Sequence, residues 1–125
     1  DFVADDYAAA EAKYRQVNAG LESRLGPEHS DLTPSLSAMG KTLFALGKKD
    51  EAQQVNERAL KIAHKHHGKY SLPAATALYS MISGGESLDP QYTKKIADQI
   101  FEIHDQIALH SWMAANARTL RAIHL

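Results

Sequence analysis

The chain has 125 residues, of which 44% are hydrophobic and 23% are charged, with only 7 glycines and 4 prolines, a composition that fits one small folded domain. Its 15 acidic residues nearly balance its 14 basic ones, so no whole-chain field draws in nucleic acid. No apolar run approaches the roughly 20 residues that a membrane-spanning helix needs, which excludes a membrane span.

Apolar residues recur at helical spacing along almost the whole chain and never alternate as in a strand. The first predicted helix covers residues 4–25. It ends at Gly26, the residue type that commonly follows a helix, and Pro27 comes next. Its predicted buried face comprises Tyr7, Ala10, Tyr14, Val17, Leu21 and Leu25.

The next two predicted helices form one complete antiparallel pair. The first begins with Thr33 as its N-cap and Pro34 at the first helical position, and ends at Gly47. The second begins with Asp50 as its cap and ends at Gly68. The residues expected to face inward are Leu36, Met39, Gly40, Leu43, Leu46, Ala52, Val55, Ala59, Leu60, Ile62 and Ala63.

A second pair follows from Pro73, and the sequence SGGESLDP interrupts it at residues 83–90. Asp89 and Pro90 repeat the combination of a cap and a proline that opens a helix. A last amphipathic stretch after Ser111 brings the expected number of helices to about six. The inward residues of this half are Leu78, Met81, Ile82, Ile96, Ile100, Ile103 and Ile107, followed by Trp112, Met113, Leu120 and Ile123.

Equivalent residues recur 42 positions apart, as from Gly26 to Gly68 and from Leu36 to Leu78. A period of this size is typical of solenoids built from stacked helix pairs. We therefore expect a single domain over residues 1–125 that is a fragment of a longer array. Its units are 1–32 (a second helix and linker), 33–72 (a complete repeat), 73–110 (a divergent repeat) and 111–125 (a terminal or capping helix).

The packing positions of residues 33–72 and the linker before them resemble a known family. Leu36, Met39, Gly40 and Leu43 on one helix and Ala52, Asn56 and Ala59 on the next match the family's pattern, as does the linker LGPEHSDL. The chain resembles the tetratricopeptide repeats, in particular the long 42-residue version found in kinesin light chains. The resemblance implies an all-α fold, a right-handed α-solenoid of antiparallel helix pairs, and a concave groove that binds a protein or peptide segment.

Small residues at the crossing of the first complete pair have a physical reason that is independent of the family. Two helices approach closely only where side chains are small, so we expect Gly40, Ala52 and Ala59 at the contact. A large residue at Gly40 or Ala52 would overpack it, at about 1 to 3 kcal/mol. Asn56 departs from the bulky residue usual in the family, and we expect it to be either partly solvated or hydrogen-bonded.

By the same resemblance, the first helix of each pair lines the groove. The groove residues expected here are Ser37, Lys41, Phe44, Thr76, Tyr79 and Ser83, with Pro34 and Ala45 beside them. Lys41 can meet a carboxylate or a main-chain carbonyl of a bound segment, and exposed aromatic rings offer a large contact area. The alternative is that Phe44 and Tyr79 are packing residues. Ser37 and Ala38 stand where the long version often has asparagine, which argues against a clamp for a terminal carboxylate.

Among the seven histidines, His64 and His67 could reach one metal ion because they are three residues apart on a predicted helix. Two ligands do not complete a site, and no cysteine or neighbouring acidic motif adds a third. We expect a solvated helix end, where imidazolium would favour the helix dipole, and no cofactor. A metal-responsive module remains the weakest alternative.

No catalytic motif is present: there is no glycine-rich phosphate loop, no nucleophile elbow and no cysteine nucleophile. We therefore expect no enzyme, but a scaffold that binds a protein or peptide. The alternatives are a structural segment that self-associates through exposed terminal faces, or the regulatory domain of a larger protein. The lack of cysteine is compatible with either redox compartment. We expect a soluble chain and favour the cytoplasm as its compartment.

Overall fold

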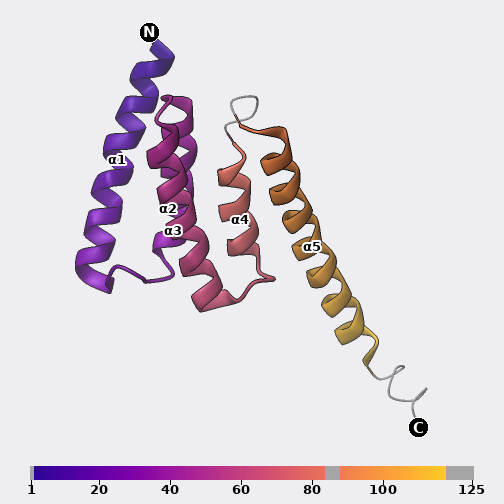
Figure 1. Cartoon of the computed structure of the whole chain (residues 1–125). Helices are drawn as coiled ribbons and strands as arrows, with labels where there is room; N and C mark the ends of the chain where they lie inside the picture. Colours follow the sequence, from indigo (N-terminus) through magenta and orange to yellow (C-terminus); the bar gives the residue numbers. More distant parts are fainter. Residues whose placement is uncertain (1, 84–87, 118–125) are drawn as a thin grey trace.

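Five α-helices make up the part of the chain that the computed structural model describes, residues 2–83 and 88–117 (Figure 1). They are α1 (Phe2–Leu25), α2 (Leu32–Ala45), α3 (Lys49–His67), α4 (Leu72–Met81) and α5 (Pro90–Ala115). No strand occurs in these residues, which confirms the prediction of an all-α chain. None of these helices is long and apolar enough to cross a membrane.

The helices pack in chain order, from α1 at one side to α5 at the other (Figure 1). α2 and α4 are the most enclosed helices, because each contacts three others, and α2 contacts α1, α3 and α4. α4 in turn contacts α3 and α5. The contact between α2 and α4 places the first helices of the two predicted pairs next to each other.

Glycines end the helices where the sequence predicts. α1 stops before Gly26 and α3 before Gly68, and both glycines have positive φ, at 96° and 85°. Only glycine adopts this backbone conformation without steric cost. The two predicted helix ends are confirmed.

The starts of the helices agree less well with prediction. Asp89 caps α5 as expected, its side chain accepting from Gln91 N at 3.2 Å. Thr33 is not a cap: α2 begins at Leu32, since the N–H of Thr33 is already bound to the Ser30 carbonyl at 3.1 Å. α4 begins at Leu72, one residue before Pro73.

Asp50 is not a cap either. α3 begins at Lys49, because the Lys48 carbonyl already accepts the N–H of Ala52 at 3.0 Å. Asp50 lies in the first turn, where its negative charge suits the helix dipole.

α5 continues through Ser111 to Ala115, so the prediction of a separate helix after Ser111 is wrong for these residues. Residues 108–115 contain neither glycine nor proline and three alanines, and nothing in them interrupts a helix. Leu120 and Ile123 of the predicted sixth helix, and the double glycine of the predicted interruption, lie outside the described residues.

Most of the predicted inward residues of α2 to α5 form the core, but Trp112 and Met113 of α5 are exposed, so that part of the prediction is wrong. Three clusters of buried side chains join α2 to α3 and α4, and α4 to α5. Their large members are Leu32, Leu36, Met39, Leu43, Phe44, Ile62, Leu78, Met81, Ile96, Ile100 and Ile103. Ile82 and Ile107 pack partly buried against them.

α1 turns inward only part of the predicted face: Tyr14 and Leu21 pack partly buried against the core, as predicted. Tyr7, Val17 and Leu25 are exposed, whereas Glu11 and Asn18 are buried, at 8% and 5% exposure. The apolar spacing misplaced Tyr7, Val17 and Leu25 because polar side chains of α1 share its contact with α2 and α3.

The tightest contact between α2 and α3 lies at Gly40 and Asn56. Asn56 is fully buried, and its Nδ2 donates to the Ser80 carbonyl of α4 at 3.1 Å. A methyl group added at Gly40 would overlap the side-chain amide of Asn56. Of the two predicted alternatives for Asn56, hydrogen bonding is therefore the correct one.

We predict that Gly40→Ala lowers the free energy of unfolding by about 1 to 3 kcal/mol, because the new methyl group overpacks the contact. The matched control is Gly20→Ala in α1, where an added Cβ meets no atom within 4 Å. This change should raise stability by roughly 0.5 to 1 kcal/mol through helix propensity. Urea unfolding followed by circular dichroism measures both.

Adding Asn56→Ala to Gly40→Ala tests whether overlap with the Asn56 side chain causes the loss of stability. The double variant should lose less stability than the sum of the single losses, by about 0.5 to 3 kcal/mol, because the second change removes the side chain that the methyl group meets. Strict additivity would contradict this account of the contact.

Candidate functional site

α2 exposes only a narrow stripe, since three other helices cover the rest of its surface. Pro34, Lys41 and Ala45 lie on this stripe and are exposed. Ser37 and Phe44, predicted to line the groove, are buried at 2% and 9% exposure. That part of the groove prediction is wrong, because the side of α2 that carries both residues faces the packed interior.

Phe44 is a core residue, as the alternative interpretation stated. It clusters with Met39, Leu43 and Ala52, and Leu88 packs against the same cluster. Ser37 lies one helical turn beyond Thr33, and both hydroxyls are buried without a hydrogen-bond partner in the described part of the chain. Neither Ser37 nor Phe44 is available to a partner protein.

α4 exposes a matching stripe. Thr76, Tyr79 and Ser83 are exposed, as the groove prediction requires, and Leu72 continues the row with 60% of its surface exposed. The spacing of four, three and four residues places these side chains on one face of the helix.

The two stripes meet at an open pocket of about 630 Å³. It lies between the starts of α2 and α4 and the end of α3. Its lining residues are Ser30, Asp31, Thr33, Pro34, His67, Leu72, Pro73 and Thr76. We call the exposed residues Pro34, Lys41, Ala45, Leu72, Thr76, Tyr79 and Ser83, together with this pocket, the α2–α4 surface.

Tyr79 and Lys41 are the two residues of the α2–α4 surface with the strongest recognition chemistry. The ring of Tyr79 is 48% exposed, and its hydroxyl lies 3.5 Å from His104 Nε2 of α5. Lys41 is exposed and forms no ion pair with the described residues, so its charge is available.

The two candidate metal ligands, His64 and His67, are exposed at the end of α3. Within residues 2–83 and 88–117, no three histidine, cysteine or acidic side chains lie close enough to hold an ion. The neighbouring residues instead secure the linker: Lys65 pairs with Glu28 at 2.8 Å, and His66 Nε2 donates to the Glu28 carbonyl at 2.6 Å.

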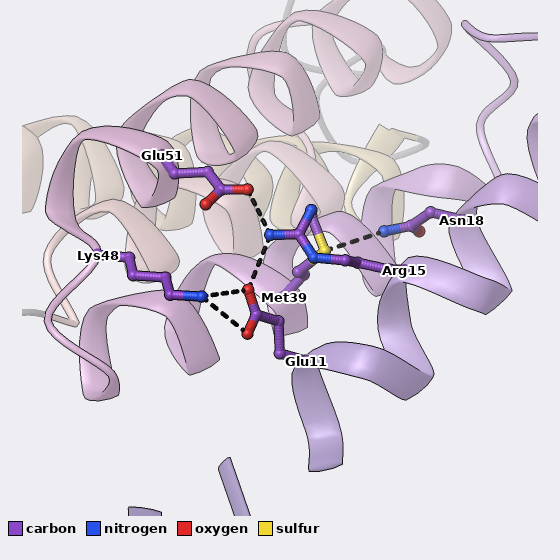
Figure 2. Close-up of polar contacts among 6 residues, drawn as sticks. All are labelled: Glu11, Arg15, Asn18, Met39, Lys48 and Glu51. Carbon is purple, nitrogen blue, oxygen red and sulfur yellow. Dashed lines mark hydrogen bonds and ion pairs between the residues drawn. The ribbon is translucent and has the colours of Figure 1, made fainter. Parts of the chain in front are cut away.

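Sequence reasoning missed the cluster of charges that joins α1 to the turn between α2 and α3 (Figure 2). The Glu11 carboxylate accepts from Arg15 at 2.7 Å and from Lys48 Nζ at 3.0 Å, and Arg15 also reaches Glu51. The hydrogen bond from Arg15, followed by that from Lys48, lowers the pKa of Glu11. With both cations bound, this carboxylate is suited to holding helices together and not to accepting a proton.

Further along α1, polar contacts continue the same interface. Asn18 Nδ2 lies 3.5 Å from the Met39 sulfur, and its Oδ1 accepts from the Ser35 hydroxyl (Figure 2 shows the first contact). Glu22 pairs with Arg58 of α3 at 2.7 Å. The only sequence signal was the i, i+4 spacing of Glu11 and Arg15, which is too common to single out a site.

Comparison of the chain with known proteins found no match among protein-family models, curated proteins or solved structures. The resemblance to tetratricopeptide repeats therefore rests on the residues quoted for it.

Glu11→Gln should lower stability by an amount on the order of 1 kcal/mol, because it removes the negative charge that Arg15 and Lys48 share. The pKa of Glu11 is lowered in the folded state, so its contribution is complete above the ordinary value of 4.5 and is lost as the pH falls through the folded pKa. Unfolding measured from pH 7 downward should show less acid sensitivity in Glu11→Gln than in the parent chain.

The control for this prediction is Glu28→Gln. Glu28 also pairs with a lysine, but both side chains are 58% exposed, so the pair contributes little. An equal loss of stability in the two variants would contradict the special role of Glu11.

Proposed function

We propose that the chain is a segment of a right-handed tetratricopeptide-like solenoid, in which α2 with α3 and α4 with α5 form successive pairs. The contact between α2 and α4 supports this arrangement, since it aligns the first helices of the two pairs. The small residues Gly40, Ala52 and Ala59 are buried between the helices, as close helix contacts require.

On this basis we propose that the chain is a scaffold that binds a protein or peptide segment at the α2–α4 surface. The pocket suits an apolar side chain, because Pro34, Leu72 and Pro73 line it. Its size of about 630 Å³ lies in the range of small-ligand sites and can accept a bulky side chain.

The residues of the α2–α4 surface outside the pocket can orient a bound segment. Lys41 can pair with a carboxylate or donate a hydrogen bond to a main-chain carbonyl of the bound segment. The exposed ring of Tyr79 offers contact area at small entropic cost. The observation that carries the proposal is that the exposed stripes of α2 and α4 share one pocket, with Pro34 and Thr76 on its two sides.

A displayed library of random peptides, selected on the immobilised chain, tests this proposal. A selected peptide should then shift the amide NMR signals of α2 and α4 more than those of α1. Tyr79→Ala and Lys41→Glu should each weaken its affinity about tenfold, or by roughly 1 to 2 kcal/mol, without loss of helicity.

The matched control is Lys13→Glu, the same charge reversal at an exposed position of α1. It should leave the affinity unchanged. Peptides that bind equally well to all three variants, or that shift only α1, would contradict the proposed site.

A further inference from the structure

The last two turns of α5 project beyond the body of the protein (Figure 1). Ile103 is the last buried residue of the helix, and Ile107 is partly buried. Every residue from 108 to 115 is exposed. We call residues 108–115 the α5 tip.

The surface of the α5 tip is apolar and uncharged. Leu109, Trp112 and Met113 are 48%, 56% and 44% exposed. No aspartate, glutamate, lysine or arginine occurs from residue 106 to residue 117. An exposed helix surrounded only by water normally carries charged side chains, so the composition of the tip indicates a contact.

We propose that the α5 tip pairs with the α5 tip of a second copy of this chain, as two antiparallel helices related by a two-fold axis. In such a pair the same patch lies on both sides of the interface, so it must be compatible with itself. The tip meets this condition because it brings no like charges together. In the antiparallel orientation the two helix dipoles point in opposite directions, which is also favourable.

Steric access agrees with this occupant. The tip extends past α4, so among the described helices none of α1 to α4 stands in the way of a second copy (Figure 1). A highly charged partner is less suitable, because the tip has no acidic side chain to pair with it. The acidic residues Asp98, Glu102 and Asp105 all lie nearer to the start of α5.

The size of the patch sets the expected affinity. The tip is 8 residues long, or roughly 12 Å of helix, so the pair buries less than the 1,200 Å² or so of a standard stable interface. We expect a weak dimer, with a Kd between about 1 µM and about 1 mM.

Trp112 is the only tryptophan of the chain, so it reports on this contact directly. Sedimentation equilibrium and tryptophan emission are measured on the whole chain over the same range of concentrations. The mean molecular mass should rise from monomer towards dimer, and the emission of Trp112 should move to shorter wavelength over the same range.

Leu109→Asp tests the surface, because it places like charges opposite each other in the pair. It should raise the Kd at least about tenfold and abolish the emission shift. The matched control is Val17→Asp on α1, where the parent side chain is 44% exposed, and it should behave as the parent chain does. Circular dichroism verifies that both variants keep their helices.

A monomer at every concentration would overturn the proposal. So would a dimer that forms without a shift in Trp112 emission, or one that Val17→Asp weakens as much as Leu109→Asp does. These measurements contain no peptide, so their outcome is independent of binding at the α2–α4 surface.

Discussion

The arrangement of the helices depends on one close contact, where the backbone of α2 at Gly40 admits the buried side chain of Asn56 from α3. The same side chain donates to the Ser80 carbonyl of α4, so a single residue relates three helices. An aliphatic residue could fill this space, but it would not specify where the end of α4 lies, because dispersion contacts have no direction and a hydrogen bond does. The Oδ1 atom of Asn56 is buried without a partner among the described residues, so burying this amide also lowers the free energy of unfolding.

The first helix is attached in another way. α3, α4 and α5 share a cluster of buried aliphatic side chains. α1 instead combines polar contacts of Glu11, Asn18 and Glu22 with the partly buried side chains of Tyr14 and Leu21. Ion pairs at a partly exposed interface contribute little individually, so α1 gains its stability from several of them acting together. The α2–α4 surface consequently rests on the apolar part of the molecule, which is the part best able to keep a binding surface rigid.

The two surfaces that we propose for interactions lie on different helices and differ in chemistry. The α2–α4 surface combines a pocket, an exposed tyrosine and an exposed lysine, features that suit a specific segment of a partner. The α5 tip contains no aspartate, glutamate, lysine or arginine, which suits contact with the same tip of a second copy. Because they share no residue, one chain could use both at the same time.

The periodicity of the sequence was sufficient to find all five described helices, the glycines that end α1 and α3, and the isoleucines by which α5 packs. The resemblance to tetratricopeptide repeats, and not the periodicity, predicted Lys41, Thr76 and Tyr79 as exposed residues of neighbouring helices, and all three are exposed. Sequence reasoning misplaced Thr33 and Asp50, since main-chain hydrogen bonds in the preceding turns decide where α2 and α3 begin. It also broke α5 at Ser111, where the chain has no residue that ends a helix.

Sequence spacing determines which residues share a face of a helix, because the turn of an α-helix is constant. It does not determine how many of those faces are covered. Only the tertiary structure shows that α2 is enclosed on three sides, which buries Ser37 and Phe44, and that α1 presents Glu11 and Asn18 to its neighbours in place of Val17. That difference arises because coverage depends on which other helices pack against a face, and those helices come from distant parts of the chain.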